Sequence, residues 1–222
     1  MKMFNRRNFI ANTALAGGGL VLASRTNAEA ADALKLSFML HATFFSSEMK
    51  LAKPLDPQAF VYDPAVPAGV GPQGIHHLAG YRPCLIAGPV DVEAYNANGK
   101  PLGFQIADWF AARGEVKIVR YGAGALVTSH FTNLIPNGLY SLFENHFDMK
   151  PIGFTPLDGT GTSNSFNADA NGSASITVKA AKKLSHANAV LLVYHSDHQS
   201  HGLQRGDIGI TAHHQLIARI PV

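Results

Sequence analysis

The chain of 222 residues contains one cysteine, Cys84, so it cannot form an internal disulfide. Its stability must come from an apolar core instead. Cys84 lies in the apolar stretch YRPCLIAGPV, which favours a buried, unreactive thiol. A copper–thiolate site would need a nearby histidine and usually a methionine, and the following stretch LIAGPVDVEAYNANGK has neither.

The chain also lacks an excess of either charge outside its first 30 residues. Outside residues 1–30 the chain has 14 basic and 14 acidic residues, and they form no basic stripe, so we expect no nucleic-acid partner. No G-x-S-x-G, H-E-x-x-H or C-x-x-C motif is present, and no nucleotide cofactor is expected. The remaining candidates for a bound partner are a small molecule or a metal ion.

Residues 1–30 have the pattern of a removable export signal. Lys2, Arg6 and Arg7 precede the short apolar run ANTALAGGGLVLAS, and the segment ends in the small-residue pattern Ala28-Glu29-Ala30. The apolar run is shorter than the roughly 20 residues needed to span a bilayer, so an uncleaved anchor is disfavoured. We therefore expect a signal peptide over 1–30 and one domain over 31–222, with no membrane span after cleavage.

The stretch NRRNFIA resembles the twin-arginine (Tat) export signals of bacteria and archaea. Asn5, Ile10 and Ala11 depart from the commonest residues of that pattern, whereas Arg25, close to the cleavage site, agrees with it. The resemblance implies a periplasmic or secreted protein that crosses the membrane already folded, often with a metal or cofactor. The stretches GLYSLFENHF, GFTPLDGTGTSNSF, HANAVLLVYHSDHQSHG and DIGITAHHQLIARIP resemble those of other exported, β-rich proteins. This likeness implies no activity and matches no characterised enzyme family.

Most of the remaining sequence alternates with the period of β-strands. Strands are predicted at the ranges 34–45, 90–95, 115–121, 125–132, 139–147, 188–195 and 213–220. Residues 107–114 predict one short helix, and residues 50–83, with six prolines and weak periodicity, predict a long irregular excursion. Asn171-Gly172 is typical of a two-residue hairpin turn. Together these features predict an all-β fold, an antiparallel β-sandwich or barrel.

Five of the eleven histidines fall between positions 195 and 214. The most apolar strand, 188–195, leads into a glycine-containing loop, and the last strand follows that loop. If the two strands are antiparallel neighbours, four imidazoles can converge at one end of the sheet: His195, His198, His201 and His213. Imidazole is the commonest ligand for transition metals, so this pattern predicts a copper or zinc site.

Strand parity separates His213 from His214, because neighbouring residues point to opposite faces. His214 shares the parity of Leu216 and Ala218, so His213 is the better ligand candidate; a β-bulge between them would reverse the order. Two other interpretations stay open for the cluster, a solvent-facing polar loop and a pocket without metal. Additional candidate ligands are Glu144 with His146, two residues apart on one strand face, and the pair His76 and His77 in the excursion.

The sequence thus supports two hypotheses. In the first, an exported β-sandwich protein binds copper or zinc through the C-terminal histidines, as an enzyme if a coordination position stays open and as a carrier or structural site if not. In the second, the chain is a non-enzymatic ligand-binding or interaction module without metal. Its pocket or interface would then use Phe44, Phe45, Tyr81 and Trp109.

Overall fold

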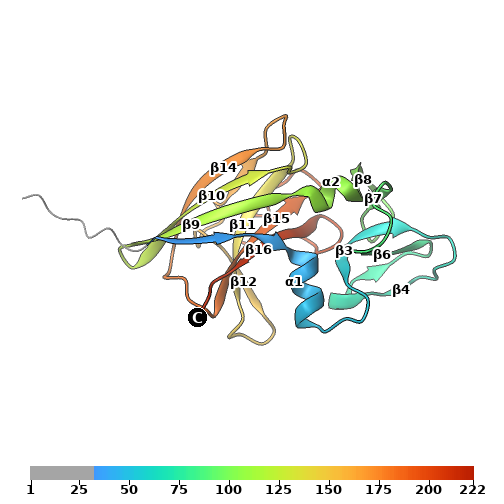
Figure 1. Cartoon of the computed structure of the whole chain (residues 1–222), viewed down its shortest axis with the longest axis horizontal. Coiled ribbons are helices and arrows are strands. Elements are labelled where there is room, and N and C mark those ends of the chain that lie inside the picture. The colour runs from blue at the N-terminus through green and yellow to red at the C-terminus, as the bar shows by residue number, and fades with distance from the viewer. Residues whose placement is uncertain (1–32) are drawn as a thin grey trace, which may run out of the picture. The chain divides into compact units, whose positions relative to one another are not determined.

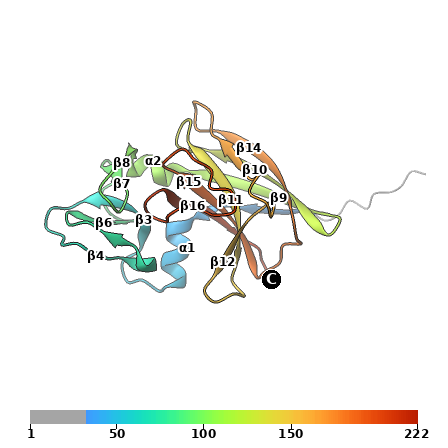
Figure 2. The same cartoon turned by 180° about the vertical axis from the view of Figure 1, so that it is seen from behind.

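The computed structural model describes residues 33–222, so the signal peptide predicted for residues 1–30 lies outside the described range. The described chain is mostly β-structure, with antiparallel strand pairs and two α-helices (Figure 1). Two large sheets face each other, and a smaller sheet lies beyond helix α1, as the reverse view also shows (Figure 2). The predicted antiparallel β-sandwich is confirmed.

Each large sheet has a simple order of neighbouring strands. The four-stranded sheet contains, in spatial order, β1 (Leu34–Ser37), β9 (Arg113–Tyr121), β10 (Gly124–Thr132) and β14 (Ala174–Ala180). The six-stranded sheet contains β12 (Gly153–Pro156), β11 (Leu139–His146), β15 (Asn188–His195), β16 (Ala212–Arg219) and β2 (Met39–Leu40), and β13 (Ser165–Asn167) also pairs with β11.

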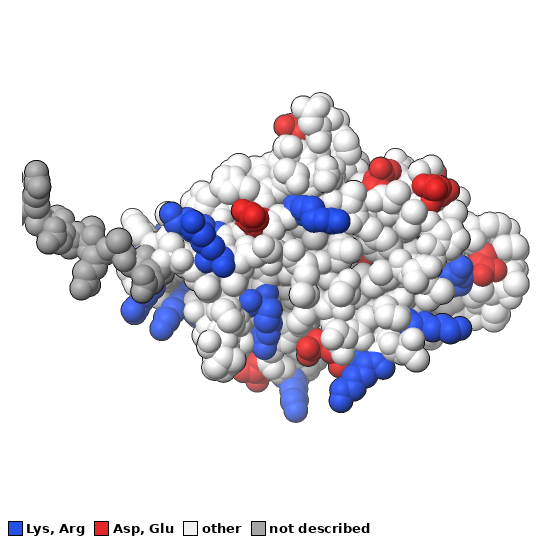
Figure 3. Space-filling model, in the orientation of Figure 1, with Lys and Arg blue, Asp and Glu red and all other residues white. Residues whose placement is uncertain are grey.

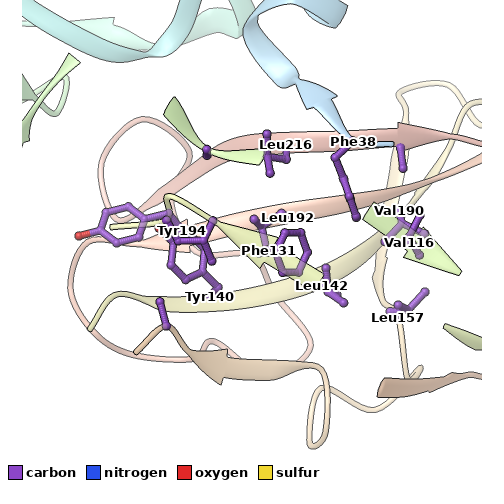
Figure 4. Close-up of a cluster of buried hydrophobic side chains, with 14 of the residues drawn as sticks. Phe38, Val116, Phe131, Tyr140, Leu142, Leu157, Val190, Leu192, Tyr194 and Leu216 are labelled. Carbon is purple, nitrogen blue, oxygen red and sulfur yellow. The ribbon is translucent and has the colours of Figure 1, made fainter. Parts of the chain in front are cut away.

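The main apolar core lies between these two sheets (Figure 4). The six-stranded sheet turns Tyr140, Leu142, Leu192 and other residues of that parity into it. The opposite face of the same sheet is also covered, and Phe143, with residues of the other parity, forms a second apolar cluster there. Every residue of β15 is therefore buried, which confirms that 188–195 is a central strand.

The smaller sheet contains β6 (Tyr81–Leu85), β3 (Leu55–Tyr62), β7 (Glu93–Tyr95) and β8 (Pro101–Gln105), and the short pair β4 (Gly69–Val70) and β5 (His76–His77) flanks the 3₁₀ turn Pro72–Gly74. The predicted irregular excursion at 50–83 thus contains four strands. Strand β3 was not predicted because it contains Pro57, and proline disfavours a regular strand. The chain accommodates it with an irregular register between Asp56 and Phe60, where the Asp56 carboxylate accepts the N–H groups of Gln58 and Ala59.

Residues 33–222 contain two α-helices, where one helix was predicted. The strand predicted at 34–45 ends at Leu40, and α1 (His41–Glu48) follows at once. This helix packs against β3 and β16 and buries His41, Ala42 and Ser46, so tertiary contacts override the strand preference of its phenylalanines. The predicted helix at 107–114 is α2 (Ile106–Ala111), and it ends before Gly114 because β9 begins at Arg113.

Asn171-Gly172 lies in a tight turn, but the turn joins strands of different sheets, β13 and β14, rather than a paired hairpin. In residues 33–222 no helix has the length and apolar character required to cross a membrane. Basic and acidic residues are interspersed on the face drawn in Figure 3, where neither sign forms a continuous stripe.

Candidate metal centre

The candidate site lies where β15 ends and the loop 196–211 begins. β15 and β16 are antiparallel neighbours, as predicted, with Tyr194 opposite His213 and His195 opposite Ala212. His195 is the last residue of β15 and shares the face of Leu191 and Val193, away from the main core. Its ring is buried, because the loop folds back over this end of the sheet.

The two ring nitrogens of His195 have different surroundings. Nε2 lies 2.7 Å from Ser141 Oγ, which lies 2.8 Å from Ser165 Oγ. Nδ1 is buried and has no hydrogen-bond partner among the described residues. With the ring proton on Nε2, donated to Ser141, the Nδ1 lone pair is free to bind an ion. Burial lowers the pKa of His195 to about 4, with a smaller contribution from nearby His201, so the ring is neutral at pH 7.

Asp197 and His201 complete the group. The ligating atoms of His195, Asp197 and His201 all lie within 4.8 Å of one another. His201 Nε2 lies 3.1 Å from Asp197 Oδ2, yet this nitrogen has no hydrogen-bond partner, so the short distance lacks hydrogen-bond geometry. Both side chains are about a quarter exposed. The group therefore has a buried side, at His195, and a side open to solvent.

This arrangement is suited to a transition metal. Two neutral imidazoles and one carboxylate are ligands that zinc accepts, and three protein ligands leave a fourth position for water or a substrate. The hydrogen bond from His195 to Ser141 matches the outer partner that metal-binding histidines commonly have. A buried His/Asp cluster that could hold a metal is thus a feature of the fold.

Two of the predicted ligands do not join this group. His198 is exposed and has a positive φ of 56°, although it lies between the two histidines that do converge. His213 is buried on the core side, beside Trp109 and Tyr194. Its Nδ1 donates to the Gln58 carbonyl at 2.9 Å and its Nε2 lies 3.2 Å from Ser196 Oγ, so neither nitrogen is free for a metal.

A β-bulge determines where His213 and His214 point. The register of β15 with β16 shifts between Leu192 and Val193, which leaves Gln215 as an extra residue. His214 therefore shares the face of Val193, the opposite of its simple parity. The two histidines thus occupy the faces opposite to those that simple alternation predicts, which is the exchange expected for a β-bulge. His214 lies against His41, at a ring distance of 4.8 Å, and accepts a hydrogen bond from Arg205 at Nε2, and so does not reach the metal group.

The additional candidates lie elsewhere. His76 is exposed on the edge of the short pair β4 and β5, and His77 packs against Phe60 of the small sheet. Glu144 and His146 lie at the far end of β11, with 3.7 Å between Oε1 and Nδ1. Glu144 is buried rather than surface-facing, and burial raises the pKa of its carboxyl.

Ser141, His195 and Asp197 also have the order of a nucleophile, a base and an acid. Hydrolysis by this set is disfavoured for two reasons. Ser141 is only 2% exposed, so a substrate cannot reach its hydroxyl. His195 Nδ1 makes no hydrogen bond to Asp197, although a catalytic base needs such a partner to orient it.

Sequence reasoning missed Asp197, which it treated as one of several polar loop residues. The available signal was the spacing His-x-Asp-x-x-x-His, in which a carboxylate follows the strand's last histidine by two residues. Comparison of the chain with protein-family models, curated proteins and solved structures gives no match. The function must therefore be inferred from the residues themselves.

Proposed function

We propose that this chain is an exported protein that binds a divalent transition metal through His195 Nδ1, Asp197 and His201 Nε2. The observation that carries the proposal is the pair of buried, unpartnered ring nitrogens beside a carboxylate. Ligands of a tetrahedral zinc ion lie about 3.4 Å apart, given metal–ligand distances near 2.1 Å. The ligand atoms here lie within 4.8 Å of one another, so a displacement of at most about 1.4 Å would bring a pair to that value.

The donor set fits the coordination that zinc prefers, although copper(II) would bind it more tightly. Zinc readily adopts a site of two imidazoles, one carboxylate and one water, and the exposed side of the group leaves room for that water. Copper(II) binds most nitrogen and oxygen sites more tightly than zinc, so it should displace zinc in a competition in solution. An open coordination position makes the site suitable for binding a substrate or for passing the metal to another protein.

Metal analysis of the purified protein tests this proposal. Protein stripped with a chelator and reloaded should bind one equivalent of zinc by titration calorimetry and mass spectrometry. D197N and H201Q should each lose stoichiometric binding, because one of three ligands is removed. H198Q is the matched control, since His198 lies in the same loop outside the group, and it should bind as the parent does. Parental affinity in D197N and H201Q would reject the site.

Export is supported by the resemblance of residues 1–30 to a Tat signal. Because this route transports folded proteins, a metal bound in the cytoplasm would cross the membrane with the chain. The test is the location of the full chain in a bacterium with a working Tat system. Replacing Arg6 and Arg7 together by lysine should retain the protein inside the cell with its leader attached. Unchanged export of that variant would refute the route and leave the metal site unaffected.

A further inference from the structure

A cleft of about 600 Å³ opens beside α1, on the face of the six-stranded sheet that points away from the main core. Its walls come from α1, the end of β11 with the segment after it, β12, and the second half of the loop 196–211. Most of the lining is apolar and includes Phe44, Phe45, Phe147, Ile152 and Ile208. This volume is typical of small-molecule sites, which are mainly apolar with a few polar groups.

One end of the cleft carries a positive charge. The Arg205 guanidinium stacks on the Phe154 ring at 3.3 Å and donates a hydrogen bond to His214 Nε2 at 2.8 Å. No described carboxylate lies within 4.0 Å of it. Burial lowers the pKa of Arg205 to about 10, so it stays charged at neutral pH. A half-buried cation without a counter-ion favours an anionic ligand.

Two further polar atoms near this end lack partners. His41 Nδ1 and Asn145 Oδ1 are buried without a hydrogen-bond partner in the described chain, and both residues line the cleft. Each of these side chains is 4% exposed. Buried polar groups are normally satisfied, and His41 Nδ1 can carry the ring proton and donate it to a bound anion. Asn145 Oδ1 can only accept, so its partner is a donor such as water rather than the anion itself.

The opposite end of the cleft is apolar and open. Met49 and Ile152, which line it, are 59% and 46% exposed. The other charged residue in the lining is Glu48, which is exposed at the end of α1, away from the helix start that carries His41. The cleft is therefore polarised, with a half-buried cation at one end and mainly apolar side chains, together with the exposed Glu48, along the rest.

We propose that this cleft binds an amphipathic monocarboxylate, with the carboxylate on Arg205 and the apolar part among Phe44, Phe45 and Phe147. A cationic ligand would face Arg205 without compensation. A dianion such as a phosphate ester would bring a second charge to a site with one cation. A single carboxylate matches the planar donors of the guanidinium and leaves an apolar tail for the rest of the cleft.

A ligand series on the unaltered protein tests the proposal without any variant. Decanoate, decanol and decyltrimethylammonium share the alkyl chain and differ in the charge of the head group. Decanoate should bind at least about tenfold more tightly than decanol by calorimetry, as expected for a charge-assisted contact, and the ammonium should bind weakest. Equal affinities for decanoate and decanol would overturn the proposal.

Variants locate the site. R205M should weaken decanoate binding by about tenfold or more, because the guanidinium contact is lost. K179M is the matched control, since Lys179 also lies over an aromatic ring, that of Tyr121 at 5.1 Å, and neither residue lines the cleft. An equal loss in both variants would mean that only net charge matters and would reject the site. If R205M does not fold, the ligand series above still decides.

The cleft and the metal centre can be tested separately. H201Q, in chelator-treated protein, should bind decanoate as the parent does, because His201 does not line the cleft. Methyl resonances of Ile152 and Ile208 should shift with decanoate and not with zinc. Shifts confined to residues outside the cleft would refute the assignment and leave the metal proposal unaffected.

Discussion

Mild acid should destabilise this fold strongly, because several histidines are buried as neutral rings. Burial lowers the pKa of His41 to about 3 and that of His213 to about 4, and it lowers the pKa of His214 well below its usual value. In the unfolded chain these rings take up a proton near pH 6.5. Their stability contribution is therefore complete above pH 6.5 and is lost as the pH falls from there towards the folded values.

The magnitude follows from proton linkage. Between pH 7 and pH 5, each ring with a folded pKa of 4 or below loses about 2 kcal/mol of folding free energy. His41 and His213 together lose about 4 kcal/mol by this linkage, and His214 adds a loss in the same direction. Burial raises the pKa of Asp56, so that carboxyl opposes the loss at the acid end. A loss of this size is a large part of a typical domain's 5–15 kcal/mol.

Urea unfolding of metal-free protein at pH 7.0, 6.0, 5.5 and 5.0 measures this dependence. The slope of the unfolding free energy between pH 6 and pH 5 should correspond to at least two protons taken up on unfolding. His41→Leu should reduce the slope by about one proton. A free energy that stays level from pH 7 to pH 5 would show that these rings are not held neutral and would refute the reasoning.

Three substitutions give further expected outcomes. Ser141→Ala should lower zinc affinity about 10–100-fold, as loss of an outer hydrogen-bond partner does, measured by competition with a chelator. Trp109→Phe removes the donor that reaches the buried Asp56 carboxylate at 2.8 Å and should cost about 1–3 kcal/mol in urea unfolding. Gly161→Ala should cost about 1–3 kcal/mol in urea unfolding and weaken zinc binding. The φ of Gly161 is +73°, and a Cβ there would overlap the backbone of Gly202, which follows the proposed ligand His201.

Period-two alternation was sufficient to predict the sandwich. The β9–β10 hairpin and the central strand β15 lie where the pattern placed them, because apolar residues facing a shared core enforce that period. The small sheet was not predictable in the same way. Its strand β3 contains Pro57 and is held by backbone contacts to Asp56, a local solution that no periodicity records. Helix α1 likewise depends on packing against distant strands rather than on its own sequence.

The spacing of the histidines located the candidate site correctly, but it did not identify which side chains would converge there. Histidine at three-residue intervals suggested one coordinated set, but the positive φ of His198 places it in a tight turn that lets the chain return to His195 only at His201. The bulge at Gln215 then sends His213 to the core face and His214 to the cleft face. One local irregularity in the strand and one in the loop thus divide the histidines among the candidate metal centre, the packed core and the proposed ligand cleft. Because the loop 196–211 contributes His201 to the first and Arg205 to the last, its conformation is the element on which both proposed sites depend.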